Sequence, residues 1–512
     1  MTAPSLQIIT WNLWVSAPVC ALAASAMVTL IAGAFWPAFA RWLTPCLALG
    51  GIALTAAFTI LAGMLGLPPA GMQVMDSFTV VFDLIILIAA FITVLVSNHY
   101  VTRENLERGE YYALMMLSAS GAMLMAASDN YVMMFLGLEL LSIPLYVLAG
   151  FSRGRSESQE SALKYLLLGA FASAFFVFGA ALVFSATGST NIVVAGDATE
   201  RALVGTTPIY VIGLAMILTA LAFKVALVPF HMWTPDVYQG APTSVTAFMA
   251  VVAKAAGFGA LARVAAAGPE GSWTVLLWGL SAATMIWGNL LAISQNNIKR
   301  LLAYSSIAHA GYLLMGILAG GRAGISAVLF YLLAYAAMTF GAFAAVIILA
   351  GRGDGAEDIE DYRGIARRSP LLGWTMAIFM FSLAGLPPFA GFFGKLYLFS
   401  AAVEAGYPGL TVLAVLTSVM GVFYYLRVTV VMWMQEPEAE SGPAAQTSAP
   451  LLSRLVLSAL AVAVLALGIF SSPVLRWTNS GSAGLERSAE AAIQMTLPEP
   501  TNAPAALSGG SR

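Results

Sequence analysis

Residues 222–233 read AFKVALVPFHMW, which places a lysine and a proline inside an apolar run. A proline removes one backbone hydrogen bond and kinks a helix, and apolar and aromatic residues continue beyond Pro229. We therefore predict one membrane span over residues 208–235, broken at Pro229, with Lys224 near the middle of the membrane. A helix that ended at Pro229 would instead let Lys224 snorkel to the surface. A lysine at the bilayer centre costs about 2.5–3.5 kcal/mol, so its presence there suggests a function.

A second interrupted stretch, LPPFAGFFGK, covers residues 386–395 and ends in Lys395. Pro387 and Pro388 predict another broken helix, five spans after the first. Because five is an odd number, the second copy of a five-span repeat must be inserted upside down. Inverted repeats with discontinuous helices are typical of transporters, in which the unwound backbone lines a polar cavity. We expect spans four to eight and nine to thirteen to be the two copies.

The composition agrees with a chain that crosses the membrane many times. Hydrophobic residues make up 60% of the 512 residues and charged residues 9%, whereas a typical soluble domain contains about 25% charged residues. We predict an all-α polytopic membrane protein of about fourteen transmembrane helices. The predicted spans are residues 13–36, 42–66, 77–97, 110–127, 130–150, 161–187, 208–235, 242–267, 273–294, 300–319, 323–350, 371–402, 408–434 and 451–474.

The loops between these spans form two sets that differ in charge. The set that is poorer in lysine and arginine contains only Arg201 and Arg322. By the positive-inside rule the richer set is cytoplasmic, and both termini then lie on the external side. The richer set contains Arg41, Arg103, Arg108, Arg153, Arg155, Lys299, Arg300, Arg352, Arg363, Arg367 and Arg368.

The chain is expected to divide into five parts. An N-terminal segment of three spans is followed by the first repeat, the second, inverted repeat, and a cytoplasmic connection with the last span. A loose external tail rich in Ala, Ser, Gly and Pro ends the chain, with a weak amphipathic helix around residues 485–495 as its one ordered element. The five parts are residues 1–108, 109–267, 268–434, 435–474 and 475–512.

Three further ionisable residues lie well inside the predicted spans. Glu139 lies near the middle of the fifth span, where a short carboxylate cannot reach the membrane surface. A protonated, hydrogen-bonded acid is the alternative to a functional charge there. Lys254 lies at the centre of the eighth span among small residues that allow close helix contact, and a structural ion pair is its alternative. Asp83, in the third span, has no assigned role.

Lys164, His231 and His309 are supporting candidates. Lys164 lies about one turn into the sixth span, so snorkelling also explains it. His231 follows the break at Pro229, and His309 lies midway along the tenth span. A neutral imidazole donates and accepts at once, so both histidines can relay protons. A histidine that only satisfies a hydrogen bond is the alternative.

The sequence predicts neither a cofactor nor a metal site in this chain. Cys20 and Cys46 are its only cysteines, too few for an iron–sulfur cluster held by thiolates. No G-x-G-x-x-G motif, Walker loop or basic tract for nucleic acid occurs. Any associated redox chemistry must therefore take place in partner proteins.

Four pairs of stretches carry a family resemblance. They are GEYY (109–112) with LGLELLS (136–142), SALKY (161–165) with LGAFAS (168–173), PFHMWTPDVY (229–238) with GAPT (240–243), and GLPP (385–388) with GFFGK (391–395). On these residues the chain resembles the antiporter-like membrane subunits of respiratory complex I, the bacterial NADH–quinone oxidoreductase. The third pair is the most specific.

The resemblance implies proton translocation along a polar axis halfway across the membrane. It assigns the charged positions of the axis to Glu139, Lys224, Lys254 and Lys395, and matches Lys164 to the family's lysine on the sixth span. It also implies the bacterial inner membrane as location, and other membrane subunits of the complex, including antiporter-like sisters, as partners in the lipid bilayer. NADH, FMN, iron–sulfur clusters and quinone would belong to partner subunits.

Two other functions are open. A subunit of a multi-subunit cation/proton antiporter would share the fold and the charged axis, and the co-purifying subunits would distinguish it. A purely structural membrane anchor is the third function, but an anchor would gain nothing from lysines inside its spans.

Overall fold

The computed structural model describes residues 3–36, 39–69, 71–106, 108–196, 208–267, 273–436 and 450–496. Within these residues the chain is helical and contains no strand. The elements are α1 (Ala3–Phe35), α2 (Ala40–Met64), α3 (Ser77–Arg103), α4 (Gly109–Ala127), α5 (Tyr131–Ala149), α6 (Ser156–Thr187), α8 (Pro208–Lys224), α9 (Trp233–Gly240), α10 (Thr243–Phe248), the π-helical turn η2 (Met249–Ala253), α11 (Lys254–Ala267), α12 (Thr274–Ile293), α13 (Ile298–Ala319), α14 (Gly321–Leu349), η3 (Arg352–Asp354), η4 (Ile359–Tyr362), α15 (Ile365–Arg368), α16 (Pro370–Ala384), α17 (Ala390–Glu404), α18 (Pro408–Met434), α19 (Leu451–Ile469) and α20 (Ser471–Thr496).

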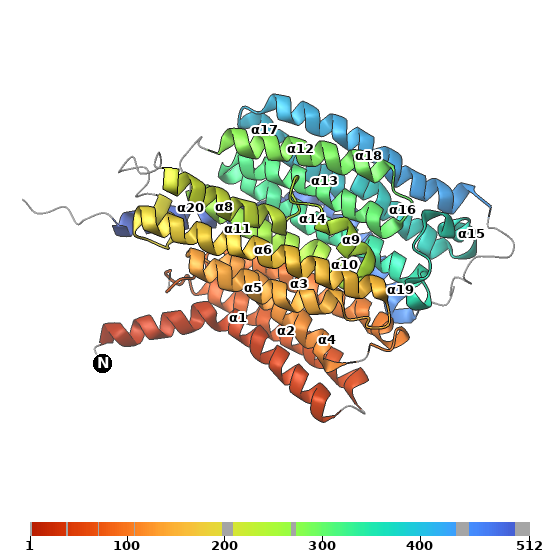
Figure 1. Ribbon diagram of the computed structural model, residues 1–512, viewed down its shortest axis with the longest axis horizontal. Helices are drawn as coiled ribbons and strands as arrows, with labels where there is room; N and C mark the ends of the chain where they lie inside the picture. The colour runs from red at the N-terminus through yellow and green to blue at the C-terminus, as the bar shows by residue number, and fades with distance from the viewer. Residues whose placement is uncertain are drawn as a thin grey trace, which may run out of the picture.

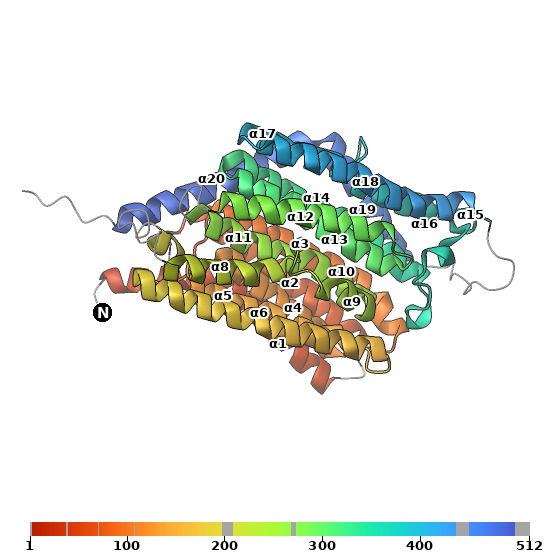
Figure 2. The ribbon, with the colours of Figure 1, turned by 45° about the horizontal axis from the view of Figure 1, so that its top comes forward.

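The long helices form one bundle and run along a common direction (Figures 1 and 2). Of the described helices, 11 are long and apolar enough to cross a membrane, with α10, η2 and α11 counted together. The shorter apolar helices α8 and α16 are the first halves of the two predicted broken spans. The prediction of an all-α, multi-pass membrane protein is confirmed.

The centre of the bundle is formed by the helices that surround Lys254. In the most apolar 18-residue stretch of Thr243–Ala267, 100% of the residues are buried, and in those of α13 and α14 the share is 94%. The corresponding share is 33% for α2, α6, α18 and α19, which therefore form much of the outer surface. Large apolar side chains are exposed on these outer helices. Such a surface fits contact with lipid or neighbouring subunits rather than with water.

Glycines bring α4 against α5 and α6 against α8. A Cβ atom added at Gly121 would lie 2.2 Å from the backbone nitrogen of Leu141, and one added at Gly179 would lie 2.5 Å from the carbonyl oxygen of Gly213. Only a residue without a side chain allows the backbones to approach so closely. These crossings fix the positions of α5 and α8 along the axis of the bundle. The two helices carry the predicted site residues Glu139 and Lys224.

The prediction of a loose C-terminal tail is wrong for residues 475–496. The last predicted span ends earlier, at Ile469, and a second helix, α20, follows directly and packs against α3 and α14. It includes the predicted short helix at 485–495 but is much longer.

Small side chains explain why α20 packs although its composition suggested disorder. Thr478, Ser482 and Leu485 are buried in the contact, and the hydroxyl groups of Thr478 and Ser326 are hydrogen-bonded at 2.9 Å. Tertiary contact thus overrides a weak local preference. The rest of the predicted tail (497–512), most of the connection (437–449) and Arg201 lie outside the described residues.

Candidate functional site: a row of buried lysines

The first predicted broken helix is present, but the break begins earlier than predicted. Helix α8 ends at Lys224 itself, residues 225–232 leave the helical path, and α9 continues from Trp233. The break was predicted at Pro229. A residue that precedes a proline avoids the helical conformation, which explains why the chain cannot resume the helix before Pro229.

Helix α8 ends in a Schellman motif. Ala226 has a left-handed φ of 63°. Its N–H donates to the carbonyl oxygen of Phe223 at 3.1 Å, and the N–H of Leu227 donates to that of Ala222 at 2.9 Å. This pair of bonds defines the motif and satisfies carbonyl groups that a buried helix end would leave free.

The second predicted break has the same cap. Between α16 and α17, Gly385 takes the left-handed position with a φ of 86°. Its N–H donates to the carbonyl oxygen of Ser382 at 3.0 Å, and the N–H of the next residue donates to that of Phe381 at 3.0 Å. Pro387 and Pro388 follow the cap, so the predicted break at these prolines is confirmed.

Lys224 is buried, with 4% of its surface exposed, and is bonded to α5 and α6. Its Nζ donates to Oγ of Ser142 at 2.8 Å and to the hydroxyl oxygen of Tyr165 at 3.2 Å. Glu139, one turn before Ser142, accepts a hydrogen bond from Ser173 and lines a groove on the surface of α5 and α6. Within the described residues Glu139 and Lys224 form no direct ion pair, but they interact electrostatically. The hydroxyl group that binds Lys224 is thus one turn of α5 away from Glu139.

Lys254 is also buried and opens α11 directly after a π-helical turn. The prediction of a regular helix over the eighth span missed this turn (Met249–Ala253). The Nζ of Lys254 donates to the carbonyl oxygen of Ser306 and lies 5.6 Å from the ring centre of Tyr335. Because π-helical turns occur frequently at functional sites, this turn agrees with a functional role for the lysine.

His309 lies among buried tyrosines next to this site. Its Nδ1 is hydrogen-bonded to the hydroxyl group of Tyr331, and its Nε2 to that of Tyr425 at 3.1 Å. The centre of its ring lies 5.3 Å from that of Tyr335. The histidine therefore connects the surroundings of Lys254 with the next part of the bundle.

Lys395 occupies the second break. Its Nζ donates to the last two carbonyl groups of α16 at 3.1 and 3.0 Å and to Oγ of Ser418 at 2.9 Å. It lies 5.2 Å from the ring centre of Tyr312, whose ring lies 5.9 Å from that of His309. The carbonyl groups at a helix C-terminus favour a positive charge. Lys254, His309 and Lys395 thus lie along one polar connection.

The structure does not bring Lys164 into this row. Its side chain is 42% exposed and pairs with Glu160 and Asp236, each at 2.7 Å. Arg300 also pairs with Asp236, at 2.9 Å. His231 is buried within the first break, and its Nδ1 has no hydrogen-bond partner among the described residues.

Arg263 is a buried charge that the loop count overlooked, because the residue lies inside the predicted eighth span. It is 6% exposed and pairs with Asp76 at 3.0 Å. The signal was present in the sequence: an arginine inside a span, on the same predicted side as Asp76 and Asp83.

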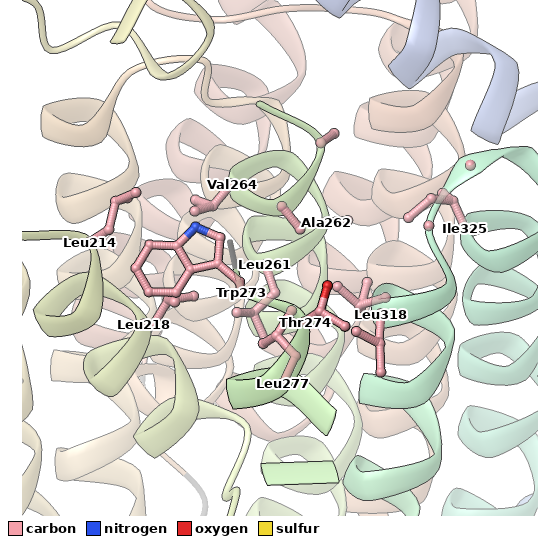
Figure 3. Close-up of a pocket in the computed structure, with 15 residues that line it drawn as sticks. Leu214, Leu218, Leu261, Ala262, Val264, Trp273, Thr274, Leu277, Leu318 and Ile325 are labelled. Atoms are coloured by element: carbon pink, nitrogen blue, oxygen red, sulfur yellow. The ribbon is translucent and has the colours of Figure 1, made fainter. Parts of the chain in front are cut away.

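A separate cavity lies away from the lysine row, between α8, α11, α12 and the start of α14 (Figure 3). It has a volume of about 270 Å³ and a mainly apolar lining. Figure 3 shows the indole of Trp273 beside Leu214 and Leu218, with Leu318 and Ile325 farther along the lining. None of the predicted site residues lines this cavity.

The described part of the chain contains no group of three His, Cys, Asp or Glu side chains that could hold a metal ion. Cys20 and Cys46 are exposed and form no disulfide.

Comparison with known proteins gives a consistent family. The model of the transmembrane region of the NADH:quinone oxidoreductase/Mrp antiporter family matches residues 128–421. The chain is 43% identical over 476 residues to NADH-quinone oxidoreductase subunit N of Trichlorobacter lovleyi, covering 92% of this chain and 97% of that protein.

Solved structures agree. A chain of respiratory complex I from Thermus thermophilus with bound aureothin has a TM-score of 0.76 at 39% identity, covering 90% of this chain and 98% of that chain. A chain of the Mrp complex from Dietzia sp. has a TM-score of 0.81 at 22% identity, covering 92% and 97%. The likeness to the Mrp complex shows the fold alone. The family match spans more than half of the sequence, and the chain belongs to the NADH-quinone oxidoreductase subunit N family.

Proposed function

We propose that the chain is a proton-translocating membrane subunit of bacterial NADH–quinone oxidoreductase. It couples electron transfer from NADH to quinone, in partner subunits, to proton pumping. The observation that carries the proposal is the buried row of Lys224, Lys254 and Lys395 in a member of the subunit N family. A structural anchor would not need such charges.

The row is closely spaced between its first two lysines. A Cβ atom added at Gly257, one turn after Lys254, would lie 3.8 Å from Cγ of Lys224. The missing side chain at Gly257 therefore lets α8 and α11 meet where the two lysines lie. Beyond Lys254, the tyrosines around His309 supply hydroxyl groups that can pass protons.

Movement of charge at Glu139 would drive the transfer. Desolvation disfavours the charged form of a lysine, and a nearby carboxylate restores it. Lys224 holds a proton while the Glu139 carboxylate is near, and releases it toward Lys254 when that charge is drawn away by a neighbouring subunit. Moving one proton against the membrane potential costs about 2.3 kcal/mol per 100 mV, so the drive comes from the partner subunits.

The proposed topology has fourteen spans, with two inverted repeats at residues 109–267 and 268–434. The matching caps before the two breaks support it. So does a second similarity: α12 and α13, the ninth and tenth spans, cross closely at a glycine, Gly288, as α4 and α5 do at Gly121. In this topology residues 1–108 form the N-terminal segment, residues 435–474 the connection with the last span, and both termini lie on the external side of the inner membrane.

We place no cofactor in this chain. NADH, FMN, the iron–sulfur clusters and quinone belong to partner subunits, and the antiporter-like sister subunits are its neighbours in the bilayer. The half-buried carboxylate of Glu139 on the α5–α6 surface fits such a neighbour, because a charge facing lipid alone would be costly.

The test replaces Lys224 in the assembled complex. Lys224→Ala and Lys224→Arg are both expected to lower NADH-driven proton pumping and coupled quinone reduction. Arginine keeps the charge but cannot release its proton. If the charge of Lys224 were only structural, the Lys224→Arg complex would therefore keep pumping. Glu404→Gln, at the exposed end of α17, is the control and keeps wild-type pumping. Full pumping in the Lys224→Ala complex would refute the proposal.

A cation/proton antiporter subunit is the second candidate, supported by the shared fold of the Mrp complex. The subunits that co-purify with the chain decide between the two. Recovery of NADH-oxidising partners supports the first function, whereas recovery of antiporter subunits alone supports the second.

A further inference from the structure

Asp83, in the membrane-crossing helix α3, is a buried acid. It takes no part in the proposed lysine row. The residue is 1% exposed, and its Oδ1 has no hydrogen-bond partner among the described residues. A buried carboxylate without a partner is costly unless it carries a proton or meets a positive charge. An acid kept in such a place therefore needs an explanation.

The packing of α3 on α11 fixes the depth of Asp83. A Cβ atom added at Gly259 of α11 would lie 3.2 Å from the ring of Phe82, so Asp83 lies near the level of Gly259. Along the axis of α11 this level is about 7.5 Å beyond Lys254 and about 6 Å short of Arg263. Asp83 thus lies between the lysine row and the end of the bundle toward which α20 extends (Figure 1).

Arg263 is the next charged group in that direction. Its Nη2 donates to Oδ1 of Asp76 at 3.0 Å and to Oγ1 of Thr79 at 2.7 Å. Burial would raise the pKa of Asp76, but the charge of Arg263 and hydrogen bonds, including one from the Thr79 backbone, hold that pKa below its usual value. Arg263 is therefore already paired with a carboxylate, and Asp83 is not needed to neutralise it. Asp83 interacts with Arg263 and Asp76 only through space.

A small cavity with a mainly apolar lining lies beyond Arg263. It has a volume of about 30 Å³ and is lined by Asp129, Arg263 and Ser488, among others. A space of this size can hold a water molecule where a few polar side chains, such as these three, line it. Burial raises the pKa of Asp129, whose Oδ2 accepts a hydrogen bond from Asn191 at 3.1 Å. Ser488 of α20 lines the cavity and donates to Oδ2 of Asp76 at 2.7 Å.

We propose that Asp83 carries protons between the lysine row and the α20 end of the bundle. An N–H bond of Lys254 breaks, water relays the proton, and an O–H bond forms on the Asp83 carboxylate. Arg263 then stabilises the carboxylate as the proton leaves toward Asp129 and the cavity. The arginine distribution makes this end external, so the path is an outlet. The inference rests on the proposed function and adds the outer half of the route.

The test compares Asp83→Asn, Asp83→Glu and Glu486→Gln in the intact complex. Glu486→Gln removes a carboxylate from α20, where its partner Arg322 is 67% exposed, and should pump like wild type. Asp83→Asn should lower the number of protons pumped per NADH oxidised by about twofold or more. Asp83→Glu should keep most of the wild-type number. Equal losses in both Asp83 variants would mean a structural role and overturn the proposal.

Infrared difference spectroscopy gives a second readout that a structural acid would not change. During turnover, wild type and Glu486→Gln should show a carboxyl C=O band that is absent in Asp83→Asn and shifted in Asp83→Glu. If Asp83→Asn does not assemble, an unshifted band in Asp83→Glu overturns the proposal. Normal pumping in Asp83→Asn overturns it as well, whereas the proposed function fails only if Lys224→Ala also pumps normally.

Discussion

One left-handed residue in each helix break determines how the neighbouring lysine is held. Ala226 and Gly385 occupy the same position of the two caps, with φ values of 63° and 86°. A side chain in this conformation costs about 1–2 kcal/mol, a cost that the first break bears and the second avoids. A Cβ atom added at Gly385 would also lie 2.9 Å from Cδ and 3.1 Å from Nζ of Lys395. Glycine at position 385 is therefore needed for two reasons: the backbone conformation and the space that the Lys395 side chain occupies.

Substituting alanine at Gly385 and glycine at Ala226 distinguishes the effect of backbone strain from the effect of displacing Lys395. Gly385→Ala is expected to destabilise the protein by about 1–2 kcal/mol and to lower pumping, because the new methyl group displaces Lys395 from the α16 carbonyl groups. Ala226→Gly is expected to keep both stability and pumping, since relief of strain offsets the added freedom of the unfolded chain. Thermal midpoints of the solubilised complex and NADH-driven pumping provide the measurements. Wild-type pumping in Gly385→Ala would contradict a role for these contacts.

The sequence alone identified the central lysines but not their surroundings. Lys224, Lys254 and Lys395 stand out because a charge in an apolar run is rare whatever the fold. The tyrosines around His309 gave no such signal, because tyrosine is common in spans and its role depends on the helix it faces. Arg263 was detectable, but only by searching the spans for arginine as well as for lysine.

At the scale of elements, apolar runs located the helices well, whereas features set by tertiary contact were missed. The π-helical turn before Lys254 leaves no mark in the apolar pattern. The part of α20 before residue 485 was not predicted because Gly and Ser are frequent there, and glycine disfavours an isolated helix by about 1 kcal/mol. The same small residues let it lie close against α3, which stabilises it.

Gly484 lets α20 approach the backbone of α3 closely. A Cβ atom added there would lie 2.9 Å from the backbone nitrogens of Ser77 and Phe78, neither of which can move without shifting the start of α3. Gly484→Ala is therefore expected to displace α20 at a cost of about 1–3 kcal/mol, as overpacking does in cores. Limited proteolysis should cut α20 faster in this variant.

Gly481→Ala is the matched control. A Cβ atom at Gly481 would meet only the side-chain ends of Leu329 and Val81, at 3.0 and 3.1 Å, which can adjust. Equal cleavage rates in both variants would show that α20 is not held by the contact at Gly484.

At the scale of the whole molecule, a buried ion network joins the two halves of the chain. Asp354, in η3 after α14, pairs with Arg155 at 2.9 Å and accepts a hydrogen bond from Tyr100 at 2.8 Å. Lys299 lies 3.1 Å from Glu357 and 3.9 Å from Asp354. Lys299 was expected in a break between spans, but it lies in the first turn of α13 and is fully buried. The network thus fixes the α13–α14 part of the bundle to α3 and α6.

Asp354→Asn tests what this network contributes. The residue has a φ of 52°, which asparagine also tolerates, so the substitution removes the charge with little change of backbone. Removing one partner of a buried pair is expected to cost about 3–5 kcal/mol, because Arg155 and Lys299 then share Glu357 alone. Glu360→Gln, which breaks an exposed pair with Arg363, is the control and should cost about 0–1 kcal/mol. Thermal midpoints of the solubilised complex measure both, and equal midpoints would mean that helix packing alone holds the two halves together.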